Sequence, residues 1–234
     1  MKKILISIFL VALGVNIYAQ GLQTSKLLGG IIKSDKWVIK NKGAEEHFDG
    51  NVSYETKDVY LSSDKAVYKK NIDTLILTKD VYVKSKADEK GDSFVEIFCH
   101  KAIYNKTAGL AEFFPKRKSK FVRLQYTDRE KNIWNGYAHK AVGDDGTKKI
   151  SLISEAKIEG ENFKIRSDVI IYNDSAKTVE TAGLKAYVEG MHDDMNFYFV
   201  SDKIKFDTER NVIYSNKNSK GLVEGLKVPE DKGL

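Results

Sequence analysis

One eight-residue pattern recurs along the chain, and it constrains the fold more than any other feature. An apolar residue is followed by a small one two positions later, then by Asp or His, and then by two mostly apolar residues two positions apart. The five copies are centred on Asp35, Asp64, His100, Asp168 and Asp202. Repeats of this period are typical of stacked units that share one continuous core, so we expect an elongated molecule.

The spacing inside each copy predicts two short strand segments joined by a bend. Positions two apart lie on the same face of a strand. Across the Asp or His the spacing is three, which would reverse the face unless the chain bends there. We therefore expect four inward columns. They are Ile32, Leu61, Ile97, Ile165 and Phe199; Ser34, Ser63, Cys99, Ser167 and Ser201; Trp37, Ala66, Ala102, Ile170 and Ile204; and Ile39, Tyr68, Tyr104, Tyr172 and Phe206.

The distances between copies suggest a sixth copy. The centres are 29, 36, 68 and 34 residues apart, and the long step is close to two ordinary ones. A degenerate copy around His139 would fill it, although its outer columns are Gly136 and Gly143. Polar turns after the copies predict a return strand in each unit. The polar stretches 40–50 and 115–120 are predicted to be loops between units.

The first residues have the three-part layout of a secretory signal peptide, residues 1–19. Two lysines precede an apolar run over 4–15, and a cleavage site follows at Ala19. The alternative is that this run is kept as a membrane anchor, although a span needs roughly 20 apolar residues. No cysteine follows the run, so a lipid-anchored protein is not expected. Residues 20–228 are predicted to form one domain, and the polar tail 229–234 is predicted to be disordered.

Composition and residue spacing argue against several classes of function. Cleavage would lower the net charge from +6 to +4 because Lys2 and Lys3 are lost, and this does not call for nucleic acid as a partner. Cys99 is the only cysteine, so an internal disulfide cannot form. The repeated acids occupy one structural slot beside a bend, where Asp typically bonds backbone N–H groups. The histidines lack the spacing of metal ligands. We predict no catalytic residue, metal or cofactor.

Three short motifs carry a resemblance to a known family. They are F-x-G-N-V at 48–52, L-S-S-D-K-A-x-Y at 61–68 and D-V-Y-V at 80–83, behind a signal peptide. The chain resembles the OstA-like family, which includes the periplasmic lipopolysaccharide-transport proteins A and C. The resemblance is clearest over 48–83 and continues as repeats to about residue 225. It implies an all-β, elongated, open twisted β-jellyroll whose two sheets form an apolar trough for lipid acyl chains. It also implies edge-to-edge joining with related proteins or with itself.

The inward columns would line such a trough. The expected lipid-binding residues are Ile39, Leu61, Tyr68, Ile97, Tyr104, Ile165, Tyr172, Phe199 and Phe206. Tyrosine suits a trough margin, since its ring can face lipid while its hydroxyl reaches water. The alternation alone fits equally well a dry core between two sheets. The basic run that includes Lys116, Arg117 and Lys118 could bind a phosphorylated head group, but such runs are also typical of solvated loops.

The sequence thus predicts a periplasmic, non-enzymatic protein that carries lipopolysaccharide or a related lipid. Its partners would be other OstA-like proteins or further copies of itself, and nucleic acid is not expected. Two alternatives remain open at this point. One is a secreted β-solenoid that binds or degrades polysaccharide. The other is a membrane-anchored adaptor of a lipid exporter, if residues 4–15 are retained.

Overall fold

The fold is known from a computed structural model. It describes residues 23–27, 30–56, 58–86, 93–117, 120–128, 130–192, 195–208, 210, 212–216 and 218–224. The predicted signal peptide and the predicted disordered tail lie outside these residues. The described residues form a 19-stranded sheet and two short 3-10 turns.

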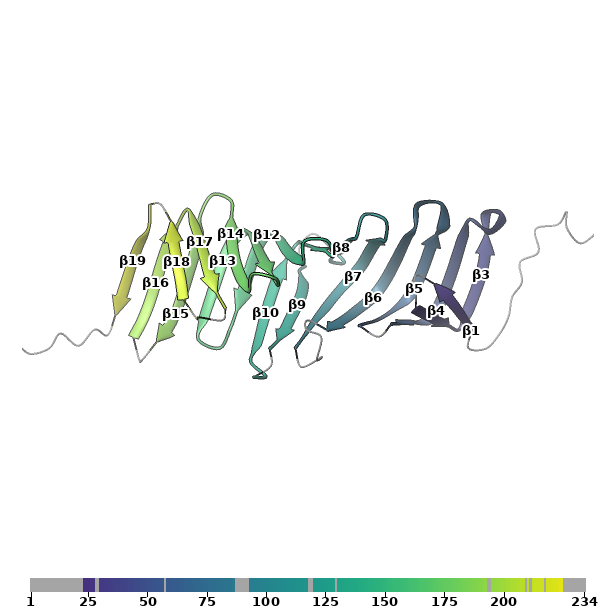
Figure 1. Cartoon of the computed structure of the whole chain (residues 1–234), viewed down its shortest axis with the longest axis horizontal. Coiled ribbons are helices and arrows are strands. Elements are labelled where there is room, and N and C mark those ends of the chain that lie inside the picture. Colours follow the sequence, from purple (N-terminus) through teal and green to yellow (C-terminus); the bar gives the residue numbers. More distant parts are fainter. Residues whose placement is uncertain are drawn as a thin grey trace, which may run out of the picture.

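The strands, in chain order, are β1 (Gln23–Leu27), β2 (Gly30–Ser34), β3 (Lys36–Lys40), β4 (Glu45–Glu55), β5 (Val59–Lys69), β6 (Thr74–Lys86), β7 (Phe94–Asn105), β8 (Leu110–Phe114), β9 (Val122–Thr127), β10 (Ile133–Ala138), β11 (Lys140–Asp144), β12 (Lys149–Glu159), β13 (Phe163–Asn173), β14 (Thr178–Ala182), β15 (Ala186–His192), β16 (Met195–Ser201), β17 (Lys203–Asp207), β18 (Val212–Asn216) and β19 (Lys220–Glu224). The 3-10 turns are η1 (Asn41–Gly43) and η2 (Lys70–Ile72). The molecule is elongated, with β1 to β5 at one end and β16 to β19 at the other (Figure 1). The predicted elongated all-β fold is confirmed.

The sheet is folded into two halves. Half A contains β1, β2, β9, β10, β15, β16 and β19, and half B contains β3, β8, β11, β14, β17 and β18. The long strands β4, β5, β6, β7, β12 and β13 pass from one half into the other. All pairings in the described sheet are antiparallel, which excludes the parallel coil of a β-helix from this region.

The line along which the chain passes between the halves is here called the corner seam. The corner falls between two strands at Asp35, His139 and Asp202. It falls within one long strand at Asp64, His100 and Asp168. A corner also lies at His139, between β10 and β11, where the sequence predicts the sixth copy. Return strands cross the seam with positive φ angles, as at Gly50 (76°) and Asn51 (46°) in β4, where the strand pairing also shifts register. A side chain on Gly50 would place its Cβ 2.5 Å from Asp35 Oδ2, so this corner requires glycine.

Most of the small-residue column closes the bends. The hydroxyls of Ser34, Ser63 and Ser201 each donate to the carbonyl two residues later, at 3.0 Å, across the bend. These three serines are buried. The thiol of Cys99 takes the same place against the carbonyl of Lys101, at 3.4 Å, and burial raises its pKa to about 12. Ser167 donates instead to the carbonyl of Ala182 at 3.1 Å.

The acids of the motif tie neighbouring corners together rather than closing their own bends. Asp35 accepts a hydrogen bond from the Asn51 side chain at 2.8 Å, and Asp202 accepts one from Asn218 at 2.7 Å. Asp168 accepts from the backbone N–H of Leu184 at 3.1 Å. The expected bond from a backbone N–H group is therefore found at Asp168, whereas Asp35 and Asp202 accept from asparagine side chains instead.

The loop predicted over 40–50 is wrong beyond its first residues. β4 begins at Glu45 and pairs with β3 and β5. Two glutamates and a glycine gave this stretch the composition of a turn, but Phe48 is 2% exposed and stacks on Trp37, with ring centroids 6.2 Å apart. Burial of this alternating face outweighs the local turn preference.

Candidate functional site

The candidate site is the apolar space between halves A and B. A single cluster of buried hydrophobic residues runs from Ile32 on β2 to Phe206 on β17, close to the full length of the sheet. In half A the predicted lining residues Leu61, Ile97 and Ile165 are buried, and Phe199 is half-buried. In half B, Phe206 is buried, whereas Tyr68, Tyr104 and Tyr172 are half-buried. Seven of the nine expected lining residues thus belong to the buried cluster or pack against it, and Tyr104 is half-buried without being part of it.

Ile39 departs furthest from the expectation, because 49% of its surface is exposed. It pairs with the buried Glu46, which in turn pairs with Tyr68. Ile39 therefore belongs to the inward row, the line of inward-facing side chains that crosses half B from strand to strand. In the described part of the chain, however, β3 pairs only with β4, so no strand covers the other flank of Ile39. Of the predicted head-group residues, Lys116 and Arg117 are exposed in the loop between β8 and β9, and Lys118 lies outside the described residues.

The two halves also meet on the side away from the corner seam, through aromatic rings. The ring centroids of Tyr126 and Tyr172 are 5.6 Å apart, those of Trp134 and Phe206 5.5 Å, and those of Phe163 and Phe206 5.2 Å. We call these five residues the aromatic side. Tyr126, Trp134 and Phe163 come from half A, and Tyr172 and Phe206 from half B. The trough is thus bridged by side chains where the open jellyroll would leave it uncovered.

Sequence reasoning missed Trp134 and Phe163, although the signal was present. Each lies five residues before a corner and two before the first inward column. Extending the motif by one strand period would have found a further column. It consists of Val59, Val95, Trp134, Phe163 and Phe197.

A small cavity of about 40 Å³ lies beside the aromatic side. It is lined mainly by apolar side chains from both halves, among them Leu124, Tyr126 and Trp134 from half A and Leu152, Ile170 and Tyr172 from half B. The degenerate copy helps to form it, since a Cβ on Gly136 would approach Leu152 Cδ1 to 2.9 Å. An acyl chain of about a dozen carbons is far larger than this cavity, so it enters only if ring side chains rotate or the halves move apart.

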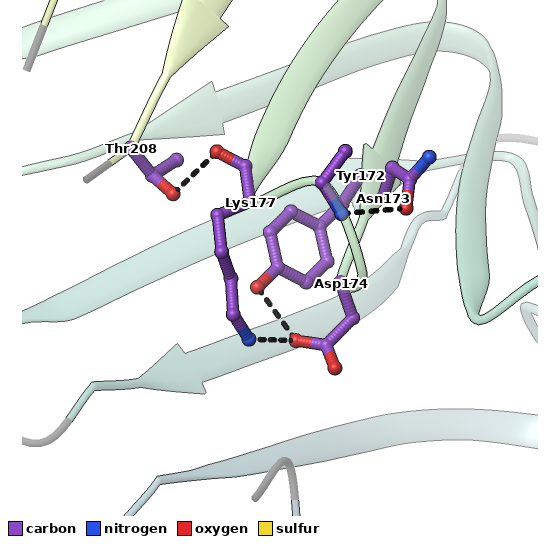
Figure 2. Close-up of polar contacts among 6 residues, drawn as sticks. Tyr172, Asn173, Asp174, Lys177 and Thr208 are labelled. Carbon is purple, nitrogen blue, oxygen red and sulfur yellow. Dashed lines mark hydrogen bonds and ion pairs between the residues drawn. The ribbon is translucent and has the colours of Figure 1, made fainter. Parts of the chain in front are cut away.

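The tyrosines of the inner row hold their hydroxyls at a polar margin. Tyr172 donates to Asp174 Oδ1 at 3.0 Å, and the same oxygen lies 2.6 Å from Lys177 Nζ (Figure 2). Tyr68 similarly donates to Asp73 at 2.6 Å. Burial, followed by the bond to Asp73, raises the pKa of Tyr68 to about 12, and burial raises the pKa of Tyr172 far above its usual range. The rings thus line the interior while the hydroxyls are held by turn carboxylates.

The described residues offer no other clear chemical centre. Among them, no three His, Cys, Asp or Glu side chains gather in a way that could hold a metal ion. No helix within the described ranges is long and apolar enough to cross a bilayer.

Comparisons with known proteins find a likeness among the solved structures. No protein-family model and no curated protein matches the sequence. Several solved structures match, and one of them is LptH from Pseudomonas aeruginosa, described as the LptA homologous periplasmic component of the conserved lipopolysaccharide transport device. The identity is 12%, the match covers 70% of this chain and 82% of that one, and the TM-score is 0.33. A TM-score this low leaves the function to be inferred from the interior itself.

Proposed function

We propose that the chain is a periplasmic carrier of lipopolysaccharide or a related lipid, and that it holds acyl chains between halves A and B. The observation that carries the proposal is the continuous apolar interior along an elongated jellyroll. The OstA-like motifs at 48–52, 61–68 and 80–83 support the choice of lipid and compartment. The work is passive shielding, so no catalytic residue is assigned.

The energies favour exchange of ring contacts for lipid. Moving an acyl chain of about a dozen carbons out of water is worth on the order of 10 kcal/mol, at about 0.8 kcal/mol per CH₂. An aromatic pair contributes about 0.5–1.5 kcal/mol beyond its buried area. Contacts such as Tyr126–Tyr172 and Trp134–Phe206 are therefore weak enough to be replaced by an acyl chain. In the empty carrier they keep water out of the interior.

The ends of the sheet suit joining to a partner. In the described sheet, β3 and β18 each pair with one strand only, as do β1 and β19. Half B contains twelve strands in antiparallel order, so β3 and β18 run in opposite directions. A second copy or an OstA-like partner could thus continue this half in antiparallel order. Tyr214 of β18 is 47% exposed and would be covered by such a contact.

Site-specific photo-crosslinking tests the proposal. A photoreactive residue at Tyr104 or Tyr172 faces the interior, whereas the same residue at Lys101 faces outward. Exposed to lipopolysaccharide, the inward positions should capture lipid and Lys101 should not. Equal capture at Lys101, or no capture at either inward position, would contradict the proposal.

A further inference from the structure

The end of the interior beside β3 and β4 contains a buried carboxylate. Glu46 of β4 is 5% exposed and lies in the inward row between Ile39 and Tyr68. Elsewhere this row contains residues such as Leu75, Ile150, Val179 and Phe206. A carboxylate among such neighbours is costly unless both of its oxygens are bonded.

Only one of its oxygens has a partner. Oε1 lies 2.7 Å from Lys70 Nζ, which balances the charge. Oε2 is buried with no hydrogen-bond partner among the described residues, and the same is true of the indole Nε1 of Trp37 on β3. Trp37 and Glu46 occupy diagonal positions on adjacent strands, since Trp37 pairs with Phe48 and Ile39 pairs with Glu46. One unmet acceptor and one unmet donor thus lie on neighbouring inward positions.

These two atoms restrict which chemical groups can bind beside them. A carboxylate oxygen accepts hydrogen bonds and repels an anion, so a phosphate does not fit against it. An ammonium group would satisfy Glu46 but would leave the indole N–H without an acceptor. A neutral group that both donates and accepts, such as a secondary amide or a hydroxyl, can satisfy both. Ile39 and Phe48 flank the pair with apolar surface, which suits an aliphatic chain attached to that group.

The opposite end of the interior differs. Its inward residues include Phe197 and Phe199 of β16, whose ring centroids are 5.7 Å apart, and Phe206 of β17. Lipid in the interior would therefore meet hydrogen-bonding groups at the β3–β4 end and aromatic carbon at the other. This asymmetry gives the carrier a preferred ligand orientation.

We propose that Glu46 and Trp37 recognise a neutral amide or hydroxyl at the head of an acyl chain, which fixes the direction in which the chain lies. The inference rests on the proposed lipid-carrying function. Binding requires movement of the side chains that now cover both atoms.

A matched pair of probes tests it on the full chain. N-methyldodecanamide donates and accepts a hydrogen bond, whereas N,N-dimethyldodecanamide only accepts. Their affinities are read by displacement of a fluorescent fatty acid. The secondary amide should bind the wild type about 3- to 10-fold more tightly, which is the ratio that one hydrogen bond gives. Glu46→Leu should reduce this ratio to about one, and Glu46→Gln should also lower it, because Lys70 takes the single side-chain carbonyl and the amide NH2 group, a donor, then lies in the place of Oε2.

The controls separate this inference from the proposed function. Glu45→Gln alters the neighbouring glutamate, which bonds His47, and should leave the ratio unchanged. Trp37→Phe should weaken both amides, since the donor to their carbonyl is lost. Equal affinity of the wild type for the two amides overturns the inference alone. Failure of both amides to displace the fatty acid overturns the proposed function as well. If Glu46→Leu does not fold, the inference is still tested by the affinity ratio of the wild type and by the Glu46→Gln and Trp37→Phe variants.

Discussion

Halves A and B are joined on two sides, and the two sides are built differently. At the corner seam the chain itself connects them, and Ser34, Ser63 and Ser201 fix the bends through hydrogen bonds. On the aromatic side they touch only through rings, such as Trp134 against Phe206. The first side fixes how the halves meet, and the second can separate without breaking a backbone bond. A carrier needs both, because it must keep its shape while its contents change.

The largest expected effect comes from the aromatic side. Phe206 is 2% exposed and contacts both Trp134 and Phe163, so Phe206→Ala should lower the free energy of unfolding by about 3–5 kcal/mol. Lipid affinity should fall in the same variant. Urea unfolding and lipid displacement measure the two effects. Leu184→Ala is the control, because Leu184 is 85% exposed and should change the unfolding energy by less than about 0.5 kcal/mol.

A substitution at the corner seam should lower the stability of the fold without changing its affinity for lipid. Ser34→Ala removes a fully buried hydroxyl that donates to the carbonyl of Lys36, which should cost about 0.5–1.5 kcal/mol of unfolding free energy. Affinity for lipid, measured on the folded protein, should stay within a factor of about two. A large loss of affinity without loss of stability would show that the seam takes part in binding. Ser62→Ala, on the opposite face of β5, is the matched control.

The smallest expected effect is a loss of folding stability at alkaline pH. The pKa of Tyr68 is raised to about 12 in the folded protein, chiefly by burial, against about 10 in the unfolded chain. The folded state therefore holds this proton more tightly, so the stability that it contributes is present below pH 10 and is lost as the pH rises toward 12. Tyr68→Phe should lack this component. Paired unfolding curves at pH 9 and 11 would reveal it, and parallel behaviour of the two proteins would refute it.

The two sides also differ in how well the sequence predicted them. The corners were predictable because a strand face cannot survive a spacing of three without a bend, and the long step between copies pointed to His139. On the aromatic side, Trp134 and Phe163 were missed because they lie one strand period outside the motif, and Tyr126 was missed because it lies on a strand that contains no copy of it. Which side chains cross from one half to the other depends on how the halves fold together, and alternation along a single strand does not encode that.

The errors at Ile39 and at 40–50 have a related cause. Ile39 follows the inward alternation but lies on a strand with a partner on one side only, and the motif has no information about sheet edges. The stretch 45–50 contains Glu46, a charged residue in the inward row. Polar composition made it look like a loop, although a lysine partner makes its burial tolerable. In both cases the missing information was the neighbour in space.

The most direct test of the account asks whether an acyl chain lies against Trp134. In a Trp37→Phe variant, Trp134 is the only tryptophan, because the chain has two. A fatty acid brominated at mid-chain should quench its fluorescence on binding, and the unbrominated acid should not. A control chain with Trp37→Phe, Trp134→Phe and Leu184→Trp places the indole at an exposed corner and should remain unquenched. Quenching at Trp134 alone is the predicted result, whereas lipid binding without quenching there, or equal quenching at position 184, would contradict it.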